Sequence, residues 1–452
     1  MTMAQTPEPE EERGGTQQAH LKDEKKTELN ASVLLASPIS LSSTTTQGGG
    51  WGLGDFWAGT ITVGLYQLEG SETGEEAAQV RTGGLQFFKV SSSEGEGGAE
   101  AEAEANQREL ALRPAQVAGG ANIVETGSGV FEIKWFHRRD LHTRSLAVAK
   151  ACGEVSVHEV TLGFGGGDRP DRPTDSESDA FVVERERELC SASLTEGLEG
   201  VFCLCVDVAA PPQGGDSPPS KLAASTSDGR VHLLSCDAGT PDLRVALEWQ
   251  AHDLEPWSVC FHAADPNLVY TGADDSFFQA WDCRQGGGGG AAVEVEAEAP
   301  GRRWVNRSTH GAGVCCVRTH RDRENLVATG SYDEHVRFWD VRMPRRPLAE
   351  LCAGGGVWRM DWCERDPSLL VTAGMQGGCR VLRVEGGGGS LEEQGAYLGH
   401  GSIAYGAGFL GLVGEGGGES LLAASCSFYD NQVHLWGVPF VRREEDRLGP
   451  SP

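Results

Sequence analysis

Five side chains carry the groups that ester hydrolysis or a related acid–base reaction would need. Asp274 stands beside a second aspartate in a predicted turn. It could be a general base, a partner for a cation or a solvated turn residue. Glu334 and His335 follow another predicted turn aspartate and could do acid–base work or form an exposed strand pair. Cys426 is a possible thiolate nucleophile, and Arg359 could hold a carboxylate or an oxyanion, or form a salt bridge within its own blade.

The elements that position these residues follow from one spacing that occurs twice. In each copy eighteen residues stand between a histidine and Thr-Gly-x-x-Asp, and five residues stand between that aspartate and Trp-Asp. This register is typical of WD40 propeller blades, in which the four side chains form a hydrogen-bonded chain that joins the strands. The two expected structural tetrads are His252, Thr271, Asp275 and Trp281, and His310, Thr329, Asp333 and Trp339.

Weaker copies of the same hairpin predict five more blades. They span 146–157, 222–234, 370–382 and 421–436, and a further one joins 57–68 to 85–90. Their period-2 alternation is that of half-buried strands. In the last copy we expect Cys426 to replace the tetrad threonine, where a buried thiol would be inert unless it acts as the nucleophile. The sequence therefore predicts an all-β, seven-bladed WD40 β-propeller over 27–440, between a disordered acidic tail (1–26) and a C-terminal tail (441–452).

An aromatic column emerges when the blades are aligned. Trp257 and Trp358 each lie fourteen residues before the second-strand threonine; Tyr405 falls close to that place, and Phe131 and Phe202 fit approximately. This position opens the innermost strand near the mouth of the channel, where rings could pack together or line a binding rim. They could also enclose a quaternary ammonium group through cation–π attraction of about 0.5–2 kcal/mol per face. The predicted substrate-binding rim is Trp257, Tyr332, Trp358, Arg359, Tyr405 and Tyr429.

Composition favours one domain with insertions. The segments 47–50, 94–106, 163–179, 211–219, 285–301, 385–395 and 411–419 are rich in Gly, in Ala and Glu or in Pro and Ser, so we expect loops there on a single scaffold. The net charge of −28 is that of solvated acidic loops, or of a surface that steers toward a basic protein partner. It disfavours a nucleic-acid-binding face.

The cysteines indicate a reducing compartment. There are 13 of them, an odd number without a paired Cys-x-x-Cys arrangement, so a disulfide framework or a zinc knuckle is not expected. Neither an N-terminal signal segment nor a run of 18 apolar residues occurs. We therefore expect a cytoplasmic protein that does not bind a membrane. Gly-x-Ser-x-Gly and His-Glu-x-x-His are also missing, and the sequence predicts neither a metal nor a cofactor.

Three short motifs carry a more specific resemblance. They are Gly-Ser-Tyr-Asp-Glu-His at 330–335, Gly-Gly-Val-Trp-Arg at 355–359 and Cys-Ser-Phe-Tyr-Asp at 426–430, in this order. With them the chain resembles the diphthine methyl esterase (diphthine methyltransferase) WD-repeat family. The resemblance touches every blade and is dense from about 246 to 436.

The resemblance implies an esterase activity on a protein side chain. Such proteins remove the methyl ester from over-methylated diphthine on the modified histidine of translation elongation factor 2. The products would be methanol and diphthine, whose free acid can then be amidated to diphthamide. A side chain on a folded partner suits an open propeller rim better than a deep pocket.

A non-catalytic adaptor is the rival class. Trp-Asp-x-Arg occurs at 281–284 and 339–342. The motif resembles the one by which substrate receptors dock onto the cullin-4 ubiquitin ligase adaptor, but it is also an ordinary blade ending. A third option, recognition of a histone or other peptide across the rim, has no residue of its own to recommend it. An adaptor should depend on Arg284 and Arg342, whereas an esterase should depend on the acids and the histidine of the rim.

Overall fold

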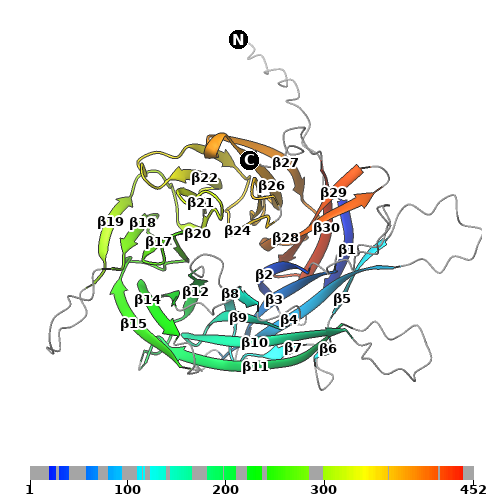
Figure 1. Ribbon diagram of the computed structural model, residues 1–452, viewed down its shortest axis with the longest axis horizontal. Helices are drawn as coiled ribbons and strands as arrows, with labels where there is room; N and C mark the ends of the chain where they lie inside the picture. Colours follow the sequence, from blue (N-terminus) through cyan, green and yellow to red (C-terminus); the bar gives the residue numbers. More distant parts are fainter. Residues whose placement is uncertain are drawn as a thin grey trace, which may run out of the picture.

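Seven sheets surround a central channel in the computed structural model, which describes residues 20–26, 30–39, 58–69, 80–93, 109–114, 116–117, 123–138, 143–164, 181–196, 198–209, 221–236, 242–284, 299–364, 366–415 and 418–440. Each sheet is one blade, with its first strand nearest the channel and later strands pairing outward (Figure 1). This is the all-β, seven-bladed propeller that the sequence predicts.

The first three blades carry the longest strands. The first contains β2 (Asn30–Ile39), β3 (Ala58–Glu69), β4 (Val80–Ser93) and β5 (Glu109–Pro114), with β7 (Ile123–Glu125) also paired to β4. The second contains β8 (Val130–Arg138), β9 (Thr143–Lys150), β10 (Glu154–Phe164) and β11 (Phe181–Ser193), with β6 (Gln116–Val117) outside β11. The third contains β12 (Cys203–Val208), β13 (Lys221–Thr226), β14 (Arg230–Cys236) and β15 (Leu243–Gln250).

The remaining blades have shorter and more regular strands, except in the last. The fourth contains β16 (Ser258–Phe261), β17 (Leu268–Gly272), β18 (Phe278–Asp282) and β19 (Gly301–Asn306). The fifth contains β20 (Val314–Thr319), β21 (Leu326–Ser331), β22 (His335–Asp340) and β23 (Ala349–Cys352). The sixth contains β24 (Arg359–Trp362), β25 (Leu369–Ala373), β26 (Cys379–Glu385) and β27 (Ser390–Tyr397). The seventh contains β28 (Ala404–Glu415), β29 (Gly418–Ser427) and β30 (Gln432–Phe440).

The propeller is closed by a strand from the beginning of the chain. β1 (His20–Lys26) pairs antiparallel with β30 and becomes the outermost strand of the seventh blade. Without it β30 would present an unpaired edge, which a closed propeller avoids. The segment 1–26, predicted as a tail, therefore ends in a strand of the propeller. Glu24 of β1 also reaches His434 of β30 at 3.5 Å.

The predicted loop insertions are only partly loops. Of the segment 385–395, Gly386–Gly388 forms a short 3-10 turn and the residues from Ser390 onward begin β27. Most of 411–419 extends the β28–β29 hairpin. The segments 47–50, 94–106 and 211–219, and nearly all of 163–179 and 285–301, lie outside the described residues. Within 385–395, the residues that follow the glycines alternate in their exposure and form the first part of β27.

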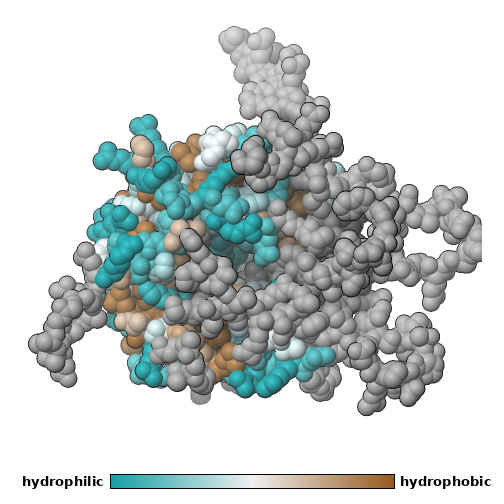
Figure 2. All heavy atoms as spheres, in the orientation of Figure 1, coloured by the Kyte–Doolittle hydropathy of each residue, from teal (hydrophilic) through white to brown (hydrophobic). Residues whose placement is uncertain are grey.

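The core lies between neighbouring blades. Trp339 and Trp436 are fully buried, and Phe278 of the fourth blade packs against Trp339 of the fifth, with ring centroids 5.5 Å apart. Hydrophilic side chains are widespread over the described part of the face in Figure 2, with hydrophobic side chains between them. Each sheet thus buries its two faces against adjacent blades and leaves its edges and turns to solvent.

The first predicted tetrad is confirmed in full. His252 Nδ1 lies 2.9 Å from Asp275 Oδ2, and its Nε2 lies 2.8 Å from Thr271 Oγ1. Trp281 Nε1 donates to the same hydroxyl at 3.0 Å. The chain of bonds joins the loop before the blade, its second strand and its third strand, as the spacing predicts.

The second predicted tetrad is confirmed for three of its four members. Thr329 Oγ1 accepts from Trp339 Nε1 at 2.8 Å and lies 3.0 Å from His310 Nε2. The predicted bond from the histidine to Asp333 is wrong, because that carboxylate accepts from Arg337 NH1 at 2.8 Å instead. Arg337 stands opposite Thr329 on β22, and a guanidinium is a stronger partner for a carboxylate than a neutral imidazole.

The prediction that Cys426 takes the threonine position in the last blade is also wrong. Ser425 holds that position: its hydroxyl accepts from Trp436 Nε1 at 2.9 Å and lies 2.6 Å from His400 Nε2. The hydroxyl residue and the tryptophan are eleven residues apart here, whereas Thr271 and Trp281 are ten apart. The longer turn shifts the register by one residue and places Cys426 on the other face of its strand.

Ser425→Ala should lower the free energy of unfolding by about 2–4 kcal/mol, because a buried indole N–H and a buried imidazole nitrogen would lose their shared partner. Urea denaturation measures this change. Ser420→Ala, on the same strand and half-buried, is the matched control and should change stability by less than about 0.5 kcal/mol. Equal effects of the two substitutions would show that the hydroxyl of Ser425 does not tie the blade.

Acid should destabilise the propeller through His310 and His400, whose Nδ1 atoms are buried. Burial lowers the pKa values of His310 and His400 to about 3, whereas an unfolded histidine titrates near about 6.5. Between these values the unfolded chain binds protons that the folded chain does not, so their contribution is present above pH 6.5 and is lost as the pH falls toward 3. At pH 5 each should cost about 2 kcal/mol. Urea midpoints at pH 7 and 5 test this, and His310→Gln should show a smaller difference between the two midpoints; the same difference would contradict the assignment.

Candidate functional site

Aromatic side chains form an almost continuous ring around the mouth of the channel. Successive ring centroids lie 4.9–6.4 Å apart. The members of this mouth ring are Phe202, Phe131, Tyr66, Phe428, Tyr405, Trp358 and Trp257. The contacts are tilted, the arrangement that aromatic pairs prefer over a face-to-face sandwich. Six of the seven blades contribute to the mouth ring.

The mouth ring arises because the start of each innermost strand faces the channel. Trp257 directly precedes β16 and Trp358 directly precedes β24, while Phe131 and Tyr405 are the second residues of β8 and β28. The predicted aromatic column therefore does line the mouth. The fifth blade departs from it, because Cys315 occupies the equivalent place and is fully buried.

Two members of the mouth ring, Tyr66 and Phe428, belong neither to the predicted aromatic column nor to the predicted rim. Tyr66 lies near the end of β3 and Phe428 lies in the turn after β29, so neither opens an innermost strand. Phe428 stands two residues before Asp430, and its place in the turn was the available signal. The predicted Tyr332 and Tyr429 lie above the ring: Tyr332 contacts Trp358 at 5.6 Å, and Tyr429, 73% exposed, meets Phe428 edge-on at 5.0 Å.

A buried ion pair forms the floor beneath the mouth ring. Arg359 Nε lies 3.1 Å from Glu132 Oε2, and both residues are buried. The guanidinium also donates to the carbonyl oxygens of Phe131 and Trp358, each at 3.2 Å. Arg359 was predicted to bind substrate or to pair within its blade, but the pair instead crosses from the sixth blade to the second. Its charge serves to hold two members of the mouth ring in place.

More charges line the channel below this pair. Arg318 NH2 lies 3.9 Å from Glu132 Oε2 and its Nε donates to a backbone carbonyl of β24, while Lys134 Nζ pairs with Asp207 Oδ1 at 3.2 Å. Burial raises the pKa of Asp361 to about 6. These groups project from the innermost strands, where alternate residues face the channel. Arg318 pairs with Glu132 and Lys134 with Asp207, so these four charges are already engaged in ion pairs.

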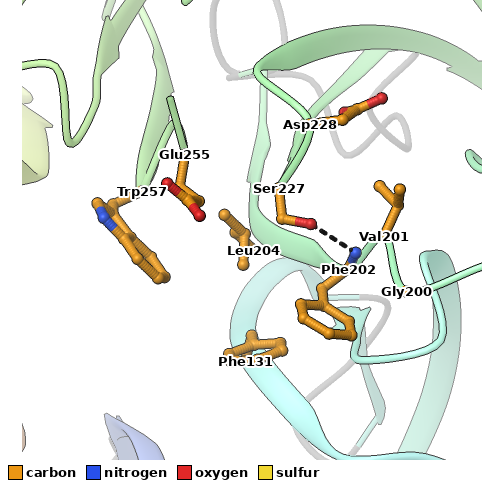
Figure 3. Close-up of a pocket in the computed structure, with 9 residues that line it drawn as sticks. All are labelled: Phe131, Gly200, Val201, Phe202, Leu204, Ser227, Asp228, Glu255 and Trp257. Atoms are coloured by element: carbon orange, nitrogen blue, oxygen red, sulfur yellow. Dashed lines mark hydrogen bonds between the residues drawn. The ribbon is translucent and has the colours of Figure 1, made fainter. Parts of the chain in front are cut away.

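A pocket opens beside the mouth ring, between the second, third and fourth blades. Its volume is about 410 Å³, within the usual range for ligand sites of roughly 300–1,000 Å³. Figure 3 shows Trp257 on one side and Phe131 and Phe202 on the other, with Leu204 between them and the Glu255 carboxylate above. The lining residues are Phe131, Gly200, Val201, Phe202, Leu204, Ser227, Asp228, Glu255 and Trp257.

Asp274 lies beside this pocket and close to the ring of Tyr332. Its backbone N–H donates to the carbonyl oxygen of Glu255 at 2.9 Å. A Cβ atom on Gly313 would lie 2.5 Å from Asp274 Oδ1 and 3.3 Å from the ring of Tyr332, so only glycine allows this close approach. Asp274 is exposed at the mouth, next to Tyr332.

The phenols of Tyr332 and Tyr405 are protonated at neutral pH. Burial raises the pKa of Tyr405 to about 12 and raises that of Tyr332 well above its usual range, and the neighbouring Cys315 adds to both shifts. A protonated phenol can donate a hydrogen bond to an oxygen that gains negative charge. The mouth therefore combines a solvent-exposed carboxylate with two hydroxyl donors.

The other predicted catalytic residues lie elsewhere. Glu334 faces the outermost strand of its blade, where Cys352 Sγ lies 4.0 Å from Glu334 Oε2. His335 Nδ1 lies 2.7 Å from the carbonyl oxygen of Asp333, to which its N–H donates. Cys426 is fully buried, and burial raises its pKa well above the usual range, which argues against a thiolate nucleophile. Of the four predicted catalytic residues, only Asp274 is at the mouth.

The described part of the chain offers neither a metal-binding cluster nor a membrane-spanning helix. It contains no group of three or more His, Cys, Asp or Glu side chains placed to hold a metal ion. None of its helical segments has the length and the apolar character needed to cross a membrane.

The known proteins to which this chain is similar include members of the family that the three motifs indicate. Residues 304–340 match the family "WD domain, G-beta repeat". The chain is 31% identical to diphthine methyltransferase of Homo sapiens over 260 residues, which are 57% of this chain and 50% of the human protein. It is 28% identical to the diphthine methyltransferase homolog of Dictyostelium discoideum over 384 residues, which are 83% of this chain and 92% of that protein. This chain resembles the diphthine methyltransferases.

The extent of the match differs among these relatives. The aligned part spans half the length of the human protein and 32% of the mouse protein, to which the chain is 36% identical. A weaker similarity, 26% identity over 102 residues, links 23% of the chain to 13% of the E3 ubiquitin-protein ligase COP1 of Arabidopsis thaliana. A chain in the "Crystal Structure of Mitotic Checkpoint Complex" superposes with a TM-score of 0.51 at 13% identity, covering 97% of this chain and 99% of that one. That likeness concerns the fold alone.

Proposed function

We propose that this chain is a carboxyl methyl esterase that acts on diphthine methyl ester of translation elongation factor 2 and releases methanol and diphthine. The observation that carries the proposal is the placement of Asp274 beside Tyr332 at an open aromatic mouth, in a chain that resembles the diphthine methyltransferases. The expected setting is diphthamide biosynthesis in the cytoplasm.

The proposed reaction is hydrolysis by an activated water molecule. Asp274 accepts a proton from water, whose oxygen attacks the carbonyl carbon of the ester. Tyr332 and Tyr405 donate hydrogen bonds to the oxygen on which negative charge develops. The tetrahedral intermediate then collapses and the bond to the methoxy group breaks. Methoxide leaves with the proton held by Asp274 and becomes methanol, and the carboxylic acid left on the substrate releases its proton to solvent as it becomes a carboxylate.

The charge on the face of the propeller that bears the mouth suits a cationic side chain on a protein partner. Among the described residues of the loops before each blade and of the turns after each second strand, Arg307 is the only lysine or arginine. The acidic residues of the same loops and turns are Glu196, Glu199, Asp228, Asp253, Glu255, Asp274, Asp275, Asp333, Glu334 and Asp430. Such a field speeds the approach of a basic surface and slows that of a nucleic acid.

A methanol assay tests the proposal. The purified chain is incubated with elongation factor 2 that carries diphthine methyl ester, and released methanol is oxidised enzymatically and quantified. We expect one methanol per modified factor, and none from elongation factor 2 that lacks the modification. A folded chain that releases no methanol from the esterified factor would refute the proposal.

A non-catalytic adaptor is the second candidate, favoured by the similarity to COP1 and by the two Trp-Asp-x-Arg motifs. Arg342 NH2 donates to Asp340 Oδ2 at 2.6 Å, and Arg284 NH1 donates to Asp282 Oδ2 at 3.1 Å, so both arginines brace their own blade ends. Both remain exposed and could meet a ligase adaptor. An adaptor would lose its partner when both arginines are replaced by alanine, whereas methanol release should continue.

A further inference from the structure

The residues that line the pocket beside the mouth ring suit a quaternary ammonium ion, a cation whose nitrogen carries no hydrogen atoms. Three aromatic side chains, Phe131, Phe202 and Trp257, border it, and Leu204 adds an apolar surface. Aromatic faces attract a cation, most strongly the face of tryptophan. A primary ammonium would lose hydrogen bonds to water here, whereas a quaternary ammonium has none to lose.

Glu255 provides the matching negative charge. Its carboxylate is half-buried and lies above Trp257 in Figure 3, directed toward the space between the rings. No hydrogen bond or ion pair links this carboxylate to another of the described residues; only its backbone carbonyl is engaged, by the N–H of Asp274. An unpaired, partly desolvated carboxylate favours a cationic ligand.

A cation already lies over one ring of this pocket. The guanidinium of Arg81 lies 4.2 Å from the centroid of Phe202 and donates to Tyr66 Oη at 3.0 Å. Arg81 is not among the residues that line the pocket. The electron-rich face of Phe202 is thus used for cation–π contact within the protein itself, and Phe131 and Trp257 remain for a ligand.

We propose that this pocket binds a quaternary ammonium group through Trp257, Phe131 and Glu255. The inference rests on the proposed function in one respect: the trimethylammonium group of diphthine would be the natural occupant. It also moves that group away from the predicted rim of Tyr332 and Tyr429 and into the pocket. Because the backbones of Glu255 and Asp274 are hydrogen-bonded, a ligand held here would present its ester on the side of Asp274.

Choline and its neutral isostere 3,3-dimethylbutan-1-ol test the pocket in the full chain. Both have the same shape, and only choline carries a positive charge. Titration followed by ligand-observed NMR should show choline binding at least about tenfold more tightly than the isostere. Equal binding of the two compounds, or no binding of choline at any concentration tested, would overturn the proposal.

Substitutions locate the site. Trp257→Leu and Glu255→Gln should each weaken choline binding by about five- to thirtyfold. Tyr429→Leu and Asp253→Asn are the matched controls, an exposed aromatic residue and an exposed carboxylate of the same face that do not line the pocket, and both should leave choline binding unchanged. Melting temperatures establish that each variant is folded, and Glu255→Gln is conservative enough to serve if Trp257→Leu is not. Loss of binding in a control and not in the pocket variants would overturn the assignment.

The result is separable from that of the methanol assay. Selective choline binding that depends on Glu255 supports the pocket even if methanol is not released, and then the proposed function alone fails. Normal methanol release by Glu255→Gln, together with equal binding of choline and the isostere, removes the pocket and leaves the esterase standing.

Discussion

Asp274→Asn should lower methanol release by about 100- to 10,000-fold, because an amide cannot accept the proton of the attacking water. The side chain is exposed and the amide has nearly the same shape, so the melting temperature should stay within about 2 °C of that of the unchanged chain. Initial rates at saturating substrate, with circular dichroism on the same samples, measure both quantities.

The control for this prediction is another exposed aspartate of the same face. Asp253→Asn changes the net charge equally but lies outside the contact with Tyr332 and Gly313. It should retain at least half of the activity. If Asp253→Asn and Asp274→Asn lowered the rate equally, charge attraction rather than proton transfer would explain the loss. An unchanged rate in Asp274→Asn would remove the aspartate from the mechanism.

Glu132→Ala should destabilise the propeller by about 3–5 kcal/mol, because it leaves the guanidinium of Arg359 buried without its counter-charge. Arg318 would lose a second interaction with the same carboxylate. Guanidinium chloride denaturation gives the free energy of unfolding. The double variant Glu132→Leu/Arg359→Met should be more stable than Glu132→Ala, since no unpaired charge remains. If the loss of stability in Glu132→Leu/Arg359→Met equalled the sum of the losses in Glu132→Leu and Arg359→Met, the two residues would not be a coupled pair.

The register of the blades could be predicted because the fold depends on local spacing. The step from Thr271 to Trp281 is set by the pleat of two paired strands and the length of one turn, and both are visible in the sequence. The aromatic column could be predicted for the same reason, since a residue at the start of an innermost strand has a similar distance along the chain to the second strand in several blades. Both inferences concern residues that are near one another along the chain.

Contacts between blades could not be predicted in this way. Arg359 pairs with Glu132, a residue 227 positions away in number and on a different sheet, and no local pattern marks such a pair. The partner of Asp333 could not be predicted, because it depends on a single residue. The fifth blade has Arg337 where the fourth has Gln279, and this arginine takes the place of the histidine as the partner of the carboxylate. The one-residue lengthening of the last turn moved the tetrad from Cys426 to Ser425.

The pocket depends on residues from three blades and was not visible in the sequence. The sequence indicates Phe131 and Phe202 only as approximate members of a column, and no local pattern distinguishes Glu255 from the other acidic residues. What distinguishes Glu255 is the absence of a partner for its carboxylate among the described residues and the rings around it, and both are properties of the assembled propeller. The chemistry of the mouth is therefore a product of blade packing more than of any motif.

Mass spectrometry of elongation factor 2 shows directly whether this chain removes the methyl ester of diphthine. The modified factor is analysed before and after incubation with the purified chain, with and without a methyl donor. We expect a loss of one methyl-ester increment that does not depend on the donor and does not occur with Asp274→Asn. An unchanged mass, or a gain of a methyl group that requires the donor, would contradict this expectation.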